Sequence, residues 1–321
     1  MTSRYRPSSR LLNIGCGDHY HADWCNLEIA SPDPKVILHD IRRGLPFEDG
    51  YFDAVYHSHV LEHLTAEVGE HFLYECLRVL RPGGVLRIVV PDLETIASLY
   101  LEKLRRVNEH QDTTVADYCW MKLELLDQMV RDQSGGLMGR YMTDPKIINS
   151  GFVRTRLGNE FARLQPSSGV GCSPGGSRTT RSLQGGWWRA FRMEIARTAV
   201  RLLLGRSAEK AFRAGVFRDS GEVHRWMYDR FSLAQTCRKL GFVQFKICGP
   251  ESSRIPDFKR FQLDAAHGVV RKPDSLFVEC LRPPAPAATN LASSPSIPAR
   301  VSESPPAHSS VLSAAQTPNA A

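Results

Sequence analysis

A glycine turn directly follows the first apolar run of the chain. Asn13–Gly17 comes straight after Leu11 and Leu12, and Glu28 stands thirteen positions after Gly15. A strand that ends in Gly-x-Gly turns sharply, so a ligand can approach its backbone and an anionic group can reach its amides. In a doubly wound sheet, a carboxylate at the end of the second strand lies beside this turn and can accept both hydroxyls of a ribose. The pattern indicates a nucleoside-type ligand; a plain turn with an exposed loop acid is the alternative.

Two features argue against a dinucleotide as this ligand. The third glycine of the dinucleotide fingerprint is missing, because His19 and Tyr20 follow Asp18. The short distance from Gly15 to Glu28 also predicts a very short first helix, which offers a poor N-terminus for a pyrophosphate. A cofactor with a ribose and an adenine but no phosphates fits better, and S-adenosylmethionine is such a cofactor.

A second group of residues that could take part in catalysis consists of His59, Glu62 and His63. A histidine or carboxylate can take the proton of a weakly nucleophilic hydroxyl, and we expect His59 to be the first candidate. In the alternative, Glu62 and His63 only cap or brace the following helix. At spacing i, i+3 and i+4 the three would share a helix face and could hold a divalent metal. Nothing in the sequence brings His224 near as a fourth ligand, so no metal site is predicted.

Short apolar runs separated by turn residues place these groups in a parallel α/β sheet. Strands are predicted over residues 11–14, 24–29, 36–38, 52–56, 85–90, 242–248 and 275–281. Helices are predicted over residues 66–80, 93–106, 114–131 and 231–240, the first of them ended by Arg81–Gly84.

The pattern divides the chain into four parts. Residues 1–10 form a flexible N-terminus, and residues 11–107 and 221–282 form the sheet domain. Residues 108–220 interrupt the strands and are predicted to be a helical, basic insertion that contains a Gly/Ser-rich stretch over 167–186. Residues 283–321 consist mainly of Pro, Ala and Ser, and we expect them to be disordered because they lack large apolar side chains.

The insertion carries the chain's excess of positive charge. Between residues 151 and 220 there are thirteen Lys or Arg against four acids, a net +9 that exceeds the +7 of the whole chain. From Trp187 to Leu203, apolar side chains recur at largely helical spacing with arginines between them, which is typical of a basic amphipathic helix. Such a helix can rest on an anionic membrane or pack on the insertion's own core, and we favour the second interpretation. No nucleic-acid-binding module accompanies the charge, so nucleic acid is not a predicted partner.

Composition excludes several classes of protein. Apolar residues make up 42% and charged residues 23% of the 321 residues, which excludes a wholly disordered or fibrous chain. No apolar run approaches the ~18 residues of a membrane-spanning helix, and residues 1–10 do not resemble a secretory signal. The eight cysteines form no Cys-x-x-Cys pair, which argues against a zinc knuckle or a disulfide scaffold. We predict a cytoplasmic protein that can also lie at the inner face of the membrane.

Five blocks, in their order and spacing, resemble the class I S-adenosylmethionine-dependent methyltransferases of the type 11-like group. They are Leu12–Glu28, His39–Ile41 with Leu45–Phe47, Phe52–Val55, His59–Leu64 and Leu80–Gly84. Three further blocks, Trp24–Glu28, His224–Tyr228 and Arg271–Leu276, are similar to a bacterial group of methyltransferases that occurs near surface-polysaccharide genes. The resemblance implies a Rossmann-like sheet with strand order 3-2-1-4-5-7-6, an antiparallel seventh strand and a helical insertion after strand five.

The resemblance also implies roles for individual residues. The cofactor site would be formed by Asn13, Gly15, Cys16, Gly17, Glu28, Asp40, Ile41 and Ser58. Within it, the glycine turn would contact the methionine part, Glu28 the ribose, and Asp40 with Ile41 the adenine. Ser58 and His59 would face the transferred methyl group, and His59, Glu62 and His63 are the candidate catalytic residues.

The resulting hypothesis is methyl transfer to oxygen of a small-molecule acceptor or of a glycan-related or lipid-linked precursor. Two alternatives remain open: a protein that binds S-adenosylmethionine without catalysis, and a peripheral membrane or anionic-ligand module that acts through the insertion. The sequence leaves the acceptor and the oligomeric state open.

Overall fold

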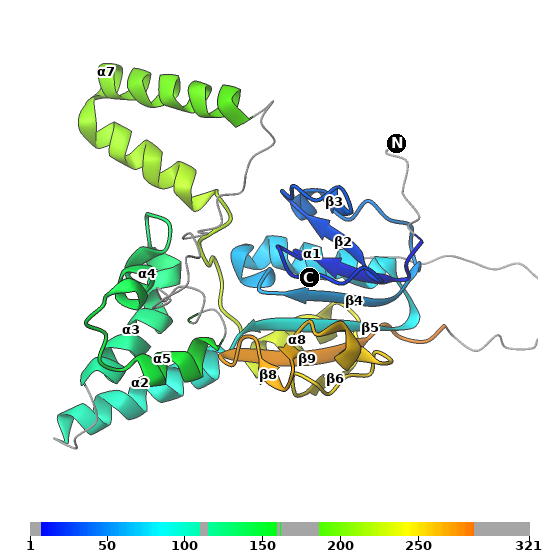
Figure 1. Cartoon of the computed structure of the whole chain (residues 1–321). Helices are drawn as coiled ribbons and strands as arrows, with labels where there is room; N and C mark the ends of the chain where they lie inside the picture. The colour runs from blue at the N-terminus through cyan, green and yellow to red at the C-terminus, as the bar shows by residue number, and fades with distance from the viewer. Residues whose placement is uncertain (1–7, 110–114, 159–160, 162–185, 286–321) are drawn as a thin grey trace, which may run out of the picture. The chain divides into compact units, whose positions relative to one another are not determined.

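Seven strands form one sheet in the order β3-β2-β1-β4-β5-β9-β6 (Figure 1). The computed structural model describes residues 8–109, 115–158, 161 and 186–285. Pairing is parallel from β3 through β5, and β9 is antiparallel to both β5 and β6. The strands are β1 (Leu11–Ile14), β2 (Cys25–Glu28), β3 (Val36–Leu38), β4 (Phe52–Ser58), β5 (Leu80–Pro91), β6 (Val243–Ile247) and β9 (Ser275–Leu281). The predicted strand order and antiparallel last strand are confirmed.

The helices lie where the apolar periodicity predicts them, with side-chain caps at several starts. They are α1 (Ala66–Val79), α2 (Leu93–Asn108), α3 (Val115–Val130), α4 (Gly136–Thr143), α5 (Ser150–Leu157), α7 (Gly186–Arg218) and α8 (Arg230–Lys239). Thr65 caps α1, Asp92 caps α2, and Asp229 forms a capping box with Ser232 at α8. The short helices α4 and α5 and the hairpin of β7 (Ala265–Ala266) and β8 (Val269–Val270) were not predicted.

Strand β5 begins earlier than the predicted Val85. Leu80 already pairs with Phe52, and the register shifts before Ala54 pairs with Val85. The Arg81–Gly84 segment is therefore an irregularity within the strand. It still ends α1, as predicted.

The two faces of the sheet have separate cores. On one face, Val55, Ile88 and Val278 pack with Phe72 of α1 and Leu233 of α8. The alternate residues of the same strands belong to the second core, which comprises Trp24, Ala54, Tyr56, Val89, Ile255, Phe258, Phe261, Leu263 and Phe277. This alternation follows from the two-residue period of a strand.

No helix connects β1 to β2, which corrects the prediction of a very short one. Residues 15–24 form only turns, and ten residues leave little room for a crossover helix. The segment over 249–274, between β6 and β9, covers this face instead. Its 3-10 turn η3 (Phe258–Phe261) places the Phe261 ring edge-on to Trp24, with 5.3 Å between ring centroids.

Helices of the insertion share a core with α2 of the sheet domain. Trp120 and Met121 are buried with Met138 of α4 and Val153 of α5, together with Ile96 of α2. Figure 1 shows these helices grouped together. Of the Gly/Ser-rich stretch predicted over 167–186, residues 167–185 lie outside the described residues, and so do residues 286–321 of the tail predicted over 283–321.

Helix α7 is bent at Gly205, whose φ of 84° is not helical. The side chains of residues 186–191, including both tryptophans, lie outside the described part of the chain. Within the rest of α7, Leu202, Leu203 and Leu204 are 79%, 81% and 71% exposed. The expectation that this apolar face packs on the insertion's own core is therefore wrong for Leu202 and Leu203, which belong to the predicted face. Among the described residues, no helix has the length and apolar character needed to cross a membrane.

Candidate functional site

The glycine turn after β1 requires glycine at its first position. Gly15 has a φ of 66° and Gly17 a φ of 55°, both in the left-handed region that favours glycine. A Cβ atom on Gly15 would lie 2.2 Å from Cγ2 of Val60, whereas one on Gly17 would meet nothing within 4 Å. Gly15 therefore allows the bend after β4 to approach the turn closely.

The amides of the turn are already used inside the protein. The N–H groups of Gly15 and Cys16 donate to the carbonyl oxygen of Leu27, and Gly17 N–H donates to Oε2 of Glu28 at 2.8 Å. Oε1 of Glu28 accepts from Ile29 N–H at 2.7 Å. The expectation that these three amides are available to an anionic group is therefore wrong. Their bonds instead hold the Glu28 carboxylate beside the turn.

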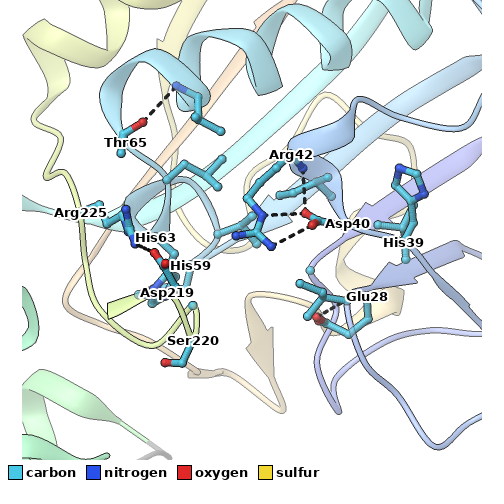
Figure 2. A pocket seen from close by; sticks show the side chains of 18 of the residues that line it. Glu28, His39, Asp40, Arg42, His59, His63, Thr65, Asp219, Ser220 and Arg225 are labelled. Atoms are coloured by element: carbon cyan, nitrogen blue, oxygen red, sulfur yellow. Dashed lines mark hydrogen bonds and ion pairs between the residues drawn. The ribbon is translucent and has the colours of Figure 1, made fainter. Parts of the chain in front are cut away.

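A cavity of about 320 Å³ opens beside the turn, where β1, β2 and β4 end. Of the predicted site residues, it brings together Gly15, Glu28, Asp40, Ile41, His59 and His63. Figure 2 shows Glu28 and Asp40 on one side and His59 and His63 on the other. A second hollow of about 420 Å³ is lined by Asn13, Gly15, Cys16, Ser58 and His59, among others. Gly15 and His59 line both spaces, whereas the exposed Gly17 and the buried Glu62 line neither.

Asp40 shapes the Glu28 side of the cavity. Its carboxylate caps the 3-10 turn η1 (Ile41–Arg43) by accepting from Arg42 N–H, and it pairs with the Arg42 guanidinium at 2.8 Å. The hydrogen bond from Arg42 holds the pKa of Asp40 below its usual range. Asp40 is thus fixed as a charged group at the cavity wall.

Two of the predicted residues that line the second hollow, Asn13 and Cys16, are themselves buried. Asn13 is buried, and its amide donates to Oδ1 of Asn26 on β2 at 3.1 Å. Burial raises the pKa of the Cys16 thiol to about 12, so this cysteine is an uncharged packing residue rather than a nucleophile.

His59 lies where β4 ends and bridges two side chains. Its φ of 55° is uncommon for a residue other than glycine. Nδ1 lies 3.1 Å from Oε1 of Glu62, and Nε2 lies 2.8 Å from Oγ of Ser275 at the start of β9. Sequence reasoning missed Ser275, which is more than two hundred positions away.

Glu62 is fully buried in the 3-10 turn η2 (Leu61–His63). The predicted helix face does not exist, because α1 begins only at Ala66; this 3-10 turn sets the spacing of His59, Glu62 and His63 instead. Burial acts to raise the pKa of Glu62, but the histidines around it lower the pKa below the usual range.

His224 joins this cluster in the fold, although nothing in the sequence indicated that it lies near. The backbone N–H groups of Arg225 and Trp226 donate to the carbonyl oxygen of Glu62, and the His63 and His224 ring centroids are 4.8 Å apart. Burial lowers the pKa of His63 and lowers that of His224 to about 3. The His224–Tyr228 block was the only signal in the sequence for this contact.

Other residues of the two spaces were not predicted. The first cavity is also lined by Arg218, the last residue of α7, and by Asp219, Ser220, Gly221 and Arg225 after it. Arg271 and Lys272 line the second hollow. Arg225 pairs with Asp219 at the first cavity, and Arg271 and Lys272 bring positive charge to the second.

Residues 18–88, which include most of this site, match the family model described as a methyltransferase domain. A probable S-adenosylmethionine-dependent methyltransferase of Mycolicibacterium smegmatis is 34% identical over 105 residues, covering 27% of this chain and 40% of that protein. The chain thus matches about two fifths of the length of this curated relative.

Solved structures with weak overall similarity include two other methyltransferases. An S-adenosylmethionine-dependent methyltransferase of Thermotoga maritima is 13% identical, with 86% of this chain and 83% of that chain covered and a TM-score of 0.32. Phosphoethanolamine N-methyltransferase 2 of Haemonchus contortus, in complex with S-adenosyl-L-methionine, is 14% identical, with coverages of 39% and 45% and a TM-score of 0.22.

The strand order, the glycine turn with its acidic partner and the match over residues 18–88 agree with one another. Residues 18–88 of the sheet domain thus match a methyltransferase domain, and the sheet has the Rossmann-like strand order that the resemblance implied.

Proposed function

We propose that the protein transfers the methyl group of S-adenosylmethionine to a hydroxyl oxygen of a small-molecule or glycan-related acceptor, phosphorylated or lipid-linked. One observation carries the proposal: His59 lines both the cavity that contains Glu28 and the neighbouring hollow. A cofactor held by Glu28 and an acceptor in the hollow would meet at this residue.

Glu28 is suited to hold the ribose. Its two oxygens accept bonds from Gly17 and Ile29, yet a carboxylate has about four lone-pair positions, so two remain for the ribose hydroxyls. Asp40 and Ile41 would border the adenine, and the turn from Gly15 to Gly17 the methionine part. Asn13 and Ser58 would border the reacting end.

His59 would act as the base. Bound S-adenosylmethionine supplies a methyl carbon already activated by the sulfonium. The site's task is then to hold the acceptor oxygen in line, about 3 Å away. As the new oxygen–carbon bond forms and the sulfur–carbon bond breaks, Nε2 of His59 exchanges its contact with Oγ of Ser275 for the acceptor and takes the hydroxyl proton, and S-adenosylhomocysteine remains. Glu62 and His63 would be positioning residues, Glu62 by holding Nδ1 of the His59 ring.

Calorimetric titration with S-adenosylmethionine and S-adenosylhomocysteine tests the cofactor site. We expect Glu28→Gln to weaken binding about ten- to a hundred-fold, because the ribose hydroxyls lose a charged acceptor. Glu67→Gln, an exposed change on α1, is the matched control and should bind like the wild type. Equal affinities in all three proteins would refute the assignment.

Turnover with a panel of sugar phosphates and lipid-linked sugars tests His59. We expect His59→Gln to lower kcat by about 10²–10⁴ while cofactor affinity stays within about threefold of the wild type. His71→Gln, exposed on α1, is the control. If His59→Gln retains full turnover, His59 is not the base. Tight cofactor binding with no turnover on any acceptor would instead favour the non-catalytic alternative.

A second proposal concerns the bend of α7, which we propose rests on an anionic membrane. It is supported by the exposed run Leu202–Leu204 beside Gly205, with Arg201 and Arg206 on either side. Arg201 and Arg197 both pair with Glu209 across the bend, while Arg206 has no ion pair among the described residues. Leucines flanked by arginines suit an interface of acyl chains and anionic headgroups.

Sedimentation with vesicles tests this surface. We expect the full chain to bind phosphatidylglycerol vesicles at 0.1 M salt, roughly the range in which surface charges still act, and to be released near 0.5 M. Replacing Leu202–Leu204 by serine should abolish binding, whereas the control Leu101→Ser, on α2, should not. Leu101 is 61% exposed, so it matches the leucines of the bend. Vesicle binding that changes neither with salt nor with the leucine substitutions would rule out the bend of α7 as the membrane-binding surface.

A further inference from the structure

Glu62 has an unusual environment for a carboxylate. It is fully buried, and neither of its oxygens accepts a well-aligned hydrogen bond from the described residues. Among the described residues, its one ion-pair contact joins Oε1 to Nδ1 of His59. A buried carboxylate with a single, poorly aligned partner is costly, and buried charges are normally fully paired or coordinate a metal.

Two further donors face the same point. One ligand atom each from Glu62, His63 and His224 lie within 4.8 Å of one another. Ligands bound at about 2.1 Å in a tetrahedral array lie about 3.4 Å apart, so inward shifts of about 1 Å each would let the three share an ion. Two imidazoles and one carboxylate are a donor set used by zinc and by non-haem iron.

The backbone holds these donors in place before any ion binds. Glu62 and His63 are neighbours in η2, and the bonds from Arg225 and Trp226 to the Glu62 carbonyl oxygen clamp the His224 segment against that turn. His224 N–H also donates to the carbonyl oxygen of Gln128 on α3.

We propose that Glu62, His63 and His224 bind a divalent transition-metal ion at the wall of the cofactor cavity. His63 lines that cavity, so a coordination position left open by the three ligands would face the place where His59 meets the acceptor. An acceptor that binds through oxygen is the ligand class this position would take. The inference goes beyond methyl transfer itself, because metal binding can be measured without cofactor or acceptor.

Metal titration of the full chain tests the site. After dialysis against a chelator, the protein is titrated with Co²⁺ and with Zn²⁺, and binding is followed by the Co²⁺ visible spectrum and by calorimetry. We expect one ion per chain, with affinity at least about 100-fold lower in His224→Gln and in His63→Gln. His71→Gln, exposed on α1, controls for adventitious binding among the eleven histidines and should match the wild type.

Each outcome decides the question. No specific binding by the folded wild type would overturn the proposal, as would binding that both His224→Gln and His63→Gln leave unchanged. Far-ultraviolet circular dichroism identifies any variant that fails to fold. The titration of the wild type tests the proposal even if a variant has to be set aside. Failure here leaves methyl transfer intact, since the Glu28 titration uses S-adenosylmethionine in metal-free buffer.

Discussion

Gly15 and Gly17 share a left-handed backbone but differ in what surrounds them. For Gly17→Ala we expect a loss of about 1–2 kcal/mol in the free energy of unfolding, the cost of a left-handed L-residue. Gly15→Ala also forces a Cβ onto Val60, so its loss should be about 2–4 kcal/mol. Urea denaturation measures both. Equal losses would mean that the contact with Val60 is easily relieved.

The buried His57 side chain is expected to make the stability of the folded protein depend on pH. Its ring is buried edge-on to Phe72, neither ring nitrogen has a hydrogen-bond partner in the described chain, and burial lowers its pKa to about 4. The unfolded chain, with a histidine pKa of about 6.5, therefore binds the proton first as pH falls, and stability is lost between about pH 6.5 and pH 4.

Replacing His57 by leucine tests this origin of acid sensitivity. At pH 7 the change should alter the free energy of unfolding by less than about 1 kcal/mol, since it removes two unsatisfied nitrogens. Between pH 7 and pH 4.5 the variant should lose about 2–3 kcal/mol less than the wild type. Urea denaturation at both pH values measures the two losses. If the wild type and the variant lose the same free energy of unfolding, the acid sensitivity does not come from His57.

At the scale of elements, Arg87 on β5 holds the 249–274 segment against the sheet. It pairs with Asp264 at 2.7 Å and Glu279 at 2.8 Å, and it donates to the carbonyl oxygens of Gly249 and Ser252. The guanidinium also lies 4.4 Å from the ring centroid of Phe258. This segment takes the place of a first helix, so its attachment matters for the whole sheet face.

Arg87→Met should be among the most destabilising changes in the domain. It leaves Asp264 and Glu279 buried without a counter-charge, for a loss of about 3–5 kcal/mol. Lys239→Met, which breaks the exposed pair with Glu70, should cost less than about 1 kcal/mol. The comparison is made by urea denaturation. Adding Asp264→Asn and Glu279→Gln should recover part of the loss, and similar costs for the two pairs would contradict the argument.

For the whole molecule, a ligand of the folded state raises stability by mass action. S-adenosylhomocysteine at 100 times its Kd should add about 2.7 kcal/mol, roughly 5 °C in Tm. In Glu28→Gln the same concentration should add only about 0.4–1.4 kcal/mol, given a ten- to hundred-fold weaker Kd. Thermal scans measure both shifts, and equal shifts would place the ligand away from Glu28.

The sequence alone determined most of the elements and their order. Strands and helices follow from local periodicity, and the glycine turn followed by Glu28 predicted a site that the fold places at one cavity. These features depend on neighbours along the chain, so composition and spacing are enough to predict them.

Only the tertiary structure decided what lies across the site. Ser275 and His224 reach the His59–Glu62 pair from more than one hundred and fifty positions away, and the 249–274 segment replaces a helix between β1 and β2. The use of the turn's amides by Leu27 and Glu28 also depends on strand pairing. Such contacts follow from which elements pack together, and periodicity along one element carries no information about that.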